Sequence, residues 1–158
     1  MIETDKAIEL AKQVKFVILD IHGILTDNTL YYTDDGKKSE CFSLADRIGC
    51  MALMEAGIGV AFLTSKISRA DEQVGEIYNV PEDRLWGTGA KMAKLDEFEK
   101  ETGLQDQDFC YVGDEMIDLG IMERVGFAVA PADGAVEAKG AAAYITTVSY
   151  THLRAHET

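Results

Sequence analysis

The chain has 158 residues, of which 47% are hydrophobic and 27% charged, a composition typical of a globular domain with its own core. Its formal net charge of −13 makes nucleic acid and anionic membranes unfavourable partners. The sequence has no apolar run near the roughly 20 residues that span a bilayer, and its cysteines (Cys41, Cys50, Cys110) lack metal-ligand spacing, so we expect a reduced, cytoplasmic protein whose thiols act as small apolar residues.

The first elements lead to a carboxylate. Residues 1–13 are acidic and lack an apolar stretch, which predicts a short amphipathic helix and no signal peptide. Residues 14–19 form an apolar run typical of a strand buried on both faces, and it ends in Asp20, with Gly23 close behind. Open parallel sheets bind ligands at this end of a strand. From this stretch alone, an ordinary strand followed by a polar turn is an equally good interpretation.

Residues 28–42 predict a β-hairpin, because two β-prone arms flank the turn dipeptide Asp35-Gly36. A hairpin inserted just after the first strand can act as a flap over the end of that strand. A plain surface hairpin or an oligomer contact fits the pattern equally well. Its aromatic residues, Tyr31, Tyr32 and Phe42, favour packing against a partner.

Helices and strands then alternate to the end of the domain. We expect helices over residues 43–56, 68–78 and 91–102, and buried strands over 59–63, 109–112, 127–130 and 144–146. This order predicts an α/β fold, a doubly wound and mostly parallel sheet with helices on both faces. Residues 1–147 are expected to form one domain. Residues 148–158 lack an apolar period and read as a non-native or disordered tail, so His152 and His156 are given no metal role.

Polar side chains follow several of these strands. They are Asp20, Thr64 with Ser65, Lys91 at a helix start, and Asp114 with Asp118. Because parallel strands bring their carboxyl ends to one edge, these groups can converge. A carboxylate can attack phosphorus, a second can help hold Mg²⁺, and a hydroxyl and an ammonium can neutralise phosphate oxygens. The alternatives are local: a helix cap at Thr64-Ser65, a solvated Lys91 with Lys94 in its place, and a solvated acidic turn.

The order of these motifs resembles the haloacid dehalogenase (HAD) superfamily. The motifs are Asp20-x-x-Gly-x-Leu-Thr-Asp, Leu-Thr64-Ser, Lys91 and Gly-Asp114-x-x-x-Asp. The hairpin, the absence of a large cap and the pattern Phe42-x-x-x-Asp-x-x-Gly are similar to one branch, the 3-deoxy-D-manno-octulosonate 8-phosphate (KDO 8-phosphate) phosphatases and the related nonulosonate 9-phosphate phosphatases. The resemblance covers roughly residues 14–147 and implies a cytoplasmic sugar-acid phosphatase of lipopolysaccharide biosynthesis.

The resemblance also implies roles in catalysis. Asp20 would be the nucleophile that becomes an aspartyl phosphate. Thr64 would bind the phosphoryl oxygens, with Ser65 near it. Lys91 would pair with both the nucleophile and the transferred group. Asp46 and Lys66 would face the sugar acid.

The metal site is implied in the same way. Mg²⁺ would be held by Asp20, by the backbone carbonyl of His22 and by Asp114, with Asp118 as an outer or water-mediated ligand. Members of this branch are typically tetramers whose flap hairpins associate, so a homo-oligomer is expected.

The sequence departs from the family in two places. His22 stands where the family has the acidic residue that protonates the leaving oxygen and then activates water. An imidazole can exchange protons near neutral pH, so a slow phosphatase is expected rather than an inactive one. The tail after residue 147 matches neither the glycine-rich turn nor the last helix of the family.

Two other functions fit parts of the pattern. One is an inactive HAD-like module that oligomerises with or regulates a sugar-nucleotide synthetase, which the His22 substitution favours. The other is a response-regulator receiver domain, which also uses an aspartyl phosphate, a Thr or Ser, a Lys and Mg²⁺. Receivers place the phosphorylated Asp after the third strand, whereas Asp20 follows the first buried strand here.

Overall fold

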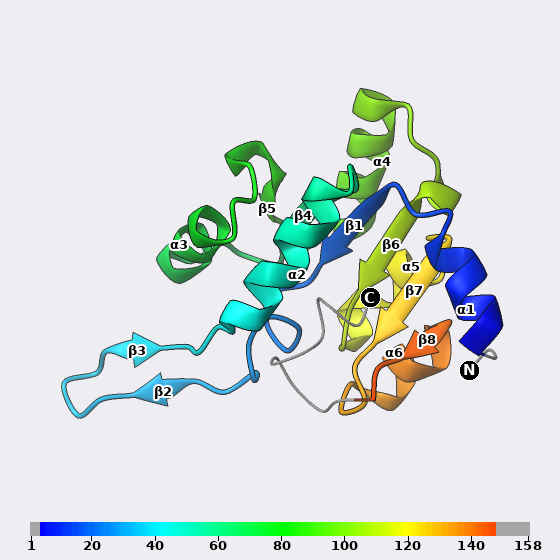
Figure 1. Ribbon diagram of the computed structural model, residues 1–158. Helices are drawn as coiled ribbons and strands as arrows, with labels where there is room; N and C mark the ends of the chain where they lie inside the picture. Colours follow the sequence, from blue (N-terminus) through cyan, green and yellow to red (C-terminus); the bar gives the residue numbers. More distant parts are fainter. Residues whose placement is uncertain (1–3, 148–158) are drawn as a thin grey trace.

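A parallel sheet forms the centre of the protein, whose computed structural model describes residues 4–147 (Figure 1). The sheet is 6-stranded, in the order β5-β4-β1-β6-β7-β8, and each neighbouring pair is parallel. The strands are β1 (Phe16–Leu19), β4 (Gly59–Thr64), β5 (Leu85–Gly87), β6 (Phe109–Val112), β7 (Phe127–Ala130) and β8 (Tyr144–Ile145). This confirms the predicted α/β sheet and adds β5, which was not among the predicted strands.

Helices cover both faces of this sheet. Residues of α1 (Thr4–Ala11), α2 (Leu44–Glu55) and α3 (Arg69–Ile77) pack on the face that carries Val17 and Leu19. Residues of α4 (Lys91–Thr102), α5 (Leu119–Met122) and α6 (Val136–Ala141) pack on the face that carries Phe16 and Ile18. Successive residues of β1 therefore enter different cores, which is why the strand reads as a continuous apolar run.

Caps and turns set the helix ends that the sequence predicted. The Ser43 side chain accepts a hydrogen bond from Ala45 N–H at the start of α2, and Ser68 forms a capping box with Asp71 at the start of α3. Gly103 ends α4 with a left-handed φ of 75°. The short α5 and α6 were not predicted. Short 3₁₀ turns precede β5, β6 and α5, at Glu82–Arg84, Asp106–Asp108 and Met116–Asp118.

The predicted hairpin is present as an antiparallel pair, β2 (Tyr31–Tyr32) and β3 (Lys38–Ser39). It projects away from the body of the molecule (Figure 1). An isolated antiparallel bridge between Thr26 and Phe42 ties its two arms together at the base. We call residues 28–42 the flap.

The remaining sequence expectations have mixed outcomes. Cys50 and Cys110 are buried, as expected for small apolar residues, but Cys41 is exposed because it lies in the flap. Among residues 4–147, no helix is long and apolar enough to cross a membrane. The tail, residues 148–158 with His152 and His156, lies outside the described residues.

Candidate active site

Asp20 directly follows β1 at the carboxyl edge of the sheet, where its side chain is buried. Its Oδ1 accepts a hydrogen bond from the N–H of Ile21 at 2.9 Å, and its Oδ2 lies 3.1 Å from Lys91 Nζ. Burial raises the pKa of Asp20 to about 6, while the charge on Lys91 opposes this rise and that on Asp118 adds to it. A buried carboxylate with a shifted pKa beside a cation is a typical functional group.

Lys91 is the first residue of α4, and its side chain is only 3% exposed. Besides Asp20, its Nζ lies 2.7 Å from Asp118 Oδ1 and donates to the Tyr111 hydroxyl at 3.0 Å. The alternative, Lys94, pairs instead with Glu97 and lies over the ring of Trp86. The structure therefore places Lys91, and not Lys94, against the carboxylate after β1.

Asp118 organises the surroundings of Lys91. It is fully buried, and its Oδ2 accepts hydrogen bonds from the N–H groups of Asp114 and Glu115 at 3.2 and 3.1 Å. Its Oδ1 accepts from Lys91 and, at 2.6 Å, from the Tyr111 hydroxyl. Because both oxygens already accept from these donors, the geometry favours Asp118 as a residue that orients Lys91 and the loop after β6.

Asp114 faces the same edge and depends on the glycine after Asp20. Gly23 has a left-handed φ of +83°, and a Cβ added there would lie 2.0 Å from Asp114 Oδ2. One carboxylate oxygen from each of Asp20, Asp114 and Asp118 lies within 4.8 Å of the other two. These hard oxygen donors suit Mg²⁺, and the missing side chain at Gly23 leaves the room that Asp114 needs to face them.

His22 lies between Thr64 and the base of the flap. Thr64 ends β4 and is buried, and its Oγ1 lies 3.3 Å from Nδ1 of His22. The other ring nitrogen of His22, Nε2, lies 3.0 Å from Oε1 of Glu40. The imidazole is thus held from two sides, with Nδ1 directed towards the predicted phosphate-binding hydroxyl.

Other predicted residues do not join this group. Ser65 and Lys66 follow β4 and are exposed. Asp46 is fully buried in the first turn of α2, where its charge contributes to the raised pKa of Cys50 and Tyr78. Thr64 and Lys91 are buried as well, so burial does not decide the role of Asp46, and its contact with the sugar acid stays a prediction.

Sequence reasoning missed Tyr111 and Glu40. Tyr111 is buried in β6, and burial raises its pKa well above the usual range, so its hydroxyl stays protonated and donates to Asp118. A tyrosine inside a buried apolar strand needs a partner for its hydroxyl, and this was the available signal. No local pattern links Glu40 to His22, because their contact depends on how the flap folds back.

The cavity beside the carboxylates is small. It has a volume of about 150 Å³ and is lined by Gly23, Asp27, Asn28, Asp114, Glu115, Asp133 and Ala135. Larger hollows of about 390 and 620 Å³ lie beside α4 and α3, lined mainly by other residues. Because neither hollow is lined by Asp20, Lys91 or Asp114, we place the candidate active site at the carboxylates.

Comparison with known proteins decides the family. Residues 87–152 match the haloacid dehalogenase-like hydrolase family model. KDO 8-phosphate phosphatase of Haemophilus influenzae is 30% identical over 143 residues, covering 85% of this chain and 74% of that protein. The chain belongs to the haloacid dehalogenase superfamily. The corresponding phosphatase of Escherichia coli K12 is 26% identical over 139 residues, covering 88% of this chain and 73% of the relative. Within the superfamily, this HAD protein is thus similar to KDO 8-phosphate phosphatases.

Solved structures share the fold of this HAD protein. The KDO 8-phosphate phosphatase of Moraxella catarrhalis, in complex with magnesium, phosphate and KDO, has a TM-score of 0.91 at 24% identity, covering 98% of this chain and 88% of its own. The cobalt-bound phosphatase of Haemophilus influenzae has a TM-score of 0.85 at 26% identity, covering 94% and 86%. These similarities confirm the capless HAD-like fold and leave the receiver-domain alternative without support.

Proposed function

We propose that this HAD protein is a Mg²⁺-dependent phosphatase that hydrolyses a phosphorylated sugar acid similar to KDO 8-phosphate, through an aspartyl phosphate on Asp20. The observation that carries the proposal is that Asp20, Asp114 and Lys91 meet at one edge of the sheet. The relative of the same superfamily with 30% identity is named for this reaction, which supports the substrate class.

The donor set fits Mg²⁺. Asp20, Asp114 and the backbone carbonyl of His22 would hold the ion, and Asp118 would orient the loop that presents Asp114. When bound, Mg²⁺ supplies positive charge that neutralises phosphate oxygens and the carboxylate pair. Because the carbonyl of His22 belongs to the backbone, this ligand does not depend on the side chain at that position.

Asp20 and Lys91 would carry the first step. An oxygen of Asp20 attacks phosphorus, the Oδ–P bond forms, and the bond from phosphorus to the sugar oxygen breaks. Lys91, held between Asp20 and Asp118, keeps an ammonium group beside the nucleophile and the transferred phosphoryl group. Thr64 would donate its hydroxyl to a phosphoryl oxygen. These groups are fixed before substrate arrives, which lowers the reorganisation needed in the transition state.

His22 would move the protons. Its Nδ1 faces Thr64, the proposed phosphate-binding residue, so a proton on Nδ1 would lie near the transferred group, and Glu40 at Nε2 would stabilise the charged ring. In the second step the neutral ring would take a proton from the water that attacks the phosphoaspartate, releasing phosphate and regenerating Asp20. His22 would thus donate and accept protons as the acidic residue of the family does, but its side chain differs in charge and length.

The flap would complete the substrate site. The cavity at the carboxylates, about 150 Å³, is too small to enclose a sugar acid with its phosphate. The flap carries the exposed side chains Leu30, Tyr31 and Tyr32, with Tyr32 exposed to 67%. We propose that flaps of neighbouring copies pack through these residues in a homotetramer and close the site.

A phosphate-release screen tests the proposed function. The full chain with Mg²⁺ is offered KDO 8-phosphate, nonulosonate 9-phosphates and hexose phosphates, beside Asp20→Asn and the exposed control Asp83→Asn. We expect turnover of a sugar-acid phosphate by the chain and by Asp83→Asn, and none by Asp20→Asn. Full activity of Asp20→Asn would exclude the covalent mechanism.

The same screen addresses the remaining alternative. If neither the chain nor the His22→Asp variant releases phosphate from any of these compounds, the protein is a non-catalytic HAD-like module, and the sugar-nucleotide synthetase partner becomes the better hypothesis.

A further inference from the structure

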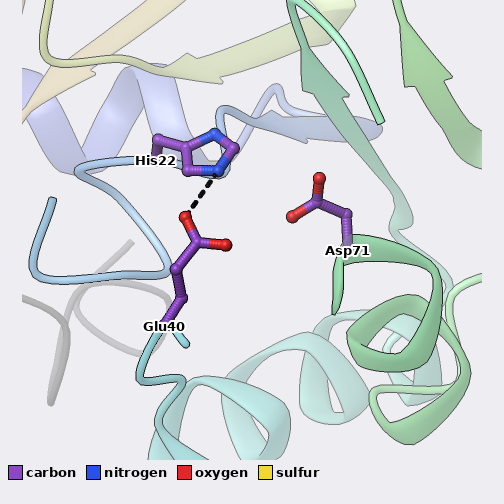
Figure 2. Close-up of side chains that lie close together, drawn as sticks. All are labelled: His22, Glu40 and Asp71. Atoms are coloured by element: carbon purple, nitrogen blue, oxygen red, sulfur yellow. Dashed lines mark ion pairs between the residues drawn. The ribbon is translucent and has the colours of Figure 1, made fainter. Parts of the chain in front are cut away.

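Three side chains from distant parts of the chain meet beside the active-site carboxylates: His22, Glu40 and Asp71 (Figure 2). His22 comes from the turn after β1, Glu40 from the flap arm after β3, and Asp71 from the first turn of α3. One ligand atom of each lies within 4.8 Å of the other two. We call these residues the HED cluster.

The carboxylate of Asp71 is buried and half satisfied. Asp71 is fully buried, and its Oδ2 accepts a hydrogen bond from Ser68 N–H at 2.7 Å. Its Oδ1 is also buried, and within residues 4–147 no hydrogen-bond donor reaches it. Figure 2 shows this carboxylate pointing towards the gap that His22 and Glu40 line from the other side. Burying a carboxylate oxygen without a hydrogen-bond donor costs free energy, and a bound cation would offset this cost.

Glu40 adds a second carboxylate to the same gap. Its side chain is only 3% exposed, and its Oε1 lies 3.0 Å from His22 Nε2 and 3.3 Å from Lys38 Nζ. The Lys38 side chain is 40% exposed, so its ammonium can turn to solvent when another cation takes its place.

The imidazole of His22 is oriented as a metal ligand would be. Metal-binding histidines usually donate the N–H of one ring nitrogen to an oxygen and bind the metal with the other. Here Nδ1 lies 3.3 Å from Thr64 Oγ1, so a proton on Nδ1 can be donated there. Nε2 pairs with Glu40 Oε1 at 3.0 Å, so a bound dication would take the place of the Nε2 proton.

We propose that the HED cluster binds a transition-metal dication of the Zn²⁺ class, through His22 Nε2 and one carboxylate oxygen each from Glu40 and Asp71. One imidazole and two carboxylates suit Zn²⁺ or Co²⁺ better than Mg²⁺, which prefers oxygen ligands. Ligands about 2 Å from a tetrahedral ion are roughly 3–3.5 Å apart, so small side-chain rotations close the present spacing.

The site is distinct from the proposed Mg²⁺ site in its donor atoms. It uses the His22 side chain, whereas Mg²⁺ would use the His22 carbonyl. A ring with a dication on Nε2 and a proton on Nδ1 has no nitrogen free to exchange protons, so the zinc-bound protein would lose the acid and base role proposed for His22. The charges also balance, because one dication neutralises the two carboxylates. Since Glu40 belongs to the flap and Asp71 to α3, the bound ion would fasten the flap to the body of the molecule.

Zinc titration of the full chain tests this proposal. The chelator-treated protein is titrated with Zn²⁺ by calorimetry, and with Co²⁺ by visible absorption, in saturating Mg²⁺ and without substrate. We expect one Zn²⁺ per chain. Asp71→Asn and Glu40→Gln should each weaken binding at least about tenfold. Because no turnover is measured, the result is independent of the phosphatase proposal.

Matched controls isolate the cluster. Asp108→Asn makes the same substitution in another capping box, where Asp108 Oδ2 accepts from Gln105 N–H at 2.9 Å, and it should leave Zn²⁺ binding unchanged. Since His152, His156 and the exposed Cys41 are zinc ligands by type, all variants are compared in a background where these become Ala, Ala and Ser. In Asp71→Asn the amide oxygen can still accept from Ser68 N–H, so the helix cap is kept.

Three results would overturn the proposal. The first is no Zn²⁺ binding by the background protein in the presence of Mg²⁺. The second is unchanged binding in Glu40→Gln, whose position at the base of the flap makes it a safeguard should Asp71→Asn fail to fold. The third is binding lost in Asp114→Asn but kept in Asp71→Asn, which would assign the ion to the active-site carboxylates.

Discussion

The carboxylate of Asp114 occupies the space that a side chain at Gly23 would need. An added Cβ would lie 2.0 Å from Asp114 Oδ2, and the φ of Gly23, +83°, is left-handed. The glycine after Asp20 therefore serves two purposes: it permits the turn, and it lets the loop that carries Asp114 approach the loop that carries Asp20.

Gly23→Ala should accordingly weaken the metal site. The left-handed backbone alone costs about 1–2 kcal/mol of stability with a non-glycine residue, and displacement of Asp114 should also reduce Mg²⁺ affinity and turnover, by at least about tenfold. Gly57→Ala is the matched control, because Gly57 has the same φ of +83° with nothing within 4 Å of the added Cβ. Equal Mg²⁺ affinities in the two variants would contradict this account.

Asp20 should make the stability of the metal-free protein depend on pH. Burial raises the pKa of Asp20 from 3.8 to about 6, so the folded state binds its proton more tightly than the unfolded state does. Stability contributed by this group is therefore present below pH 4 and is lost as the pH rises through 6. We expect Asp20→Asn to gain about 2–3 kcal/mol relative to the native chain between pH 4 and 7.5.

Urea unfolding with a chelator present measures this difference. Added Mg²⁺ should reverse it by stabilising the native chain more than Asp20→Asn. If the stabilities of the native chain and of Asp20→Asn change in parallel across this pH range, burial does not raise the pKa of Asp20.

Tyr111→Phe should disturb Lys91 without touching the metal ligands. It removes the 2.6 Å hydrogen bond to Asp118 Oδ1 and the acceptor for Lys91. The loss should cost about 1–3 kcal/mol of stability, because the partner is charged, and should lower kcat with little change in Mg²⁺ affinity. Tyr78→Phe is the comparison, since the buried Tyr78 hydroxyl donates to Ser43 O and should affect stability alone. Equal kcat values for both variants would show that the Tyr111 hydroxyl does not assist Lys91 in catalysis.

His22→Asp should raise turnover, by about tenfold or more if the imidazole is the poorer acid and base. His22→Asn keeps the backbone carbonyl and a side chain of similar size but can neither donate nor accept a proton in the reaction, so its activity should fall below that of the native chain. Phosphate release measured across pH 5 to 9 compares the three proteins. Identical profiles would make His22 a bystander.

Flap substitutions should change the oligomeric state. Replacing Tyr31 and Tyr32 by Ser removes exposed aromatic surface, while leaving the bridge between Thr26 and Phe42 intact. We expect the variant to elute as a smaller species in light-scattering chromatography and to lose sugar-acid phosphatase activity, while a simple aryl phosphate is still hydrolysed. An unchanged mass would place the subunit contact elsewhere.

Much of the fold was predictable because its signals are local. Apolar runs ending in polar residues located β1, β4 and β6, and the helix over residues 91–102 was predicted with its bounds. The three-residue β5 and the short α5 and α6 were not predicted. A strand of three residues, or a helix of fewer than about two turns, is too short to show a hydrophobic period. These elements gain their stability from packing on the sheet.

For the candidate site, the sequence predicted the residues that follow strands or begin helices, but not their long-range contacts. The positions of Asp20, Lys91 and Asp114 follow from strand ends and helix starts, which topology brings to one edge. The contacts of Tyr111 and Glu40 join residues far apart in the sequence, and they require the folded sheet and flap. The expected contact of Asp46 with the sugar acid stays a prediction, because only its motif position suggested it.

The bridge between Thr26 and Phe42 joins the two arms of the flap at its base, so the flap is expected to move as one unit. Glu40 lies in the flap, two residues before Phe42, and its carboxylate contacts the ring of His22. If a neighbouring copy contacts the distant tip of the flap, as proposed, the contact would also bear on His22, the residue proposed to move protons. Assembly and rate become linked variables: specific activity should fall on dilution, well before any subunit unfolds.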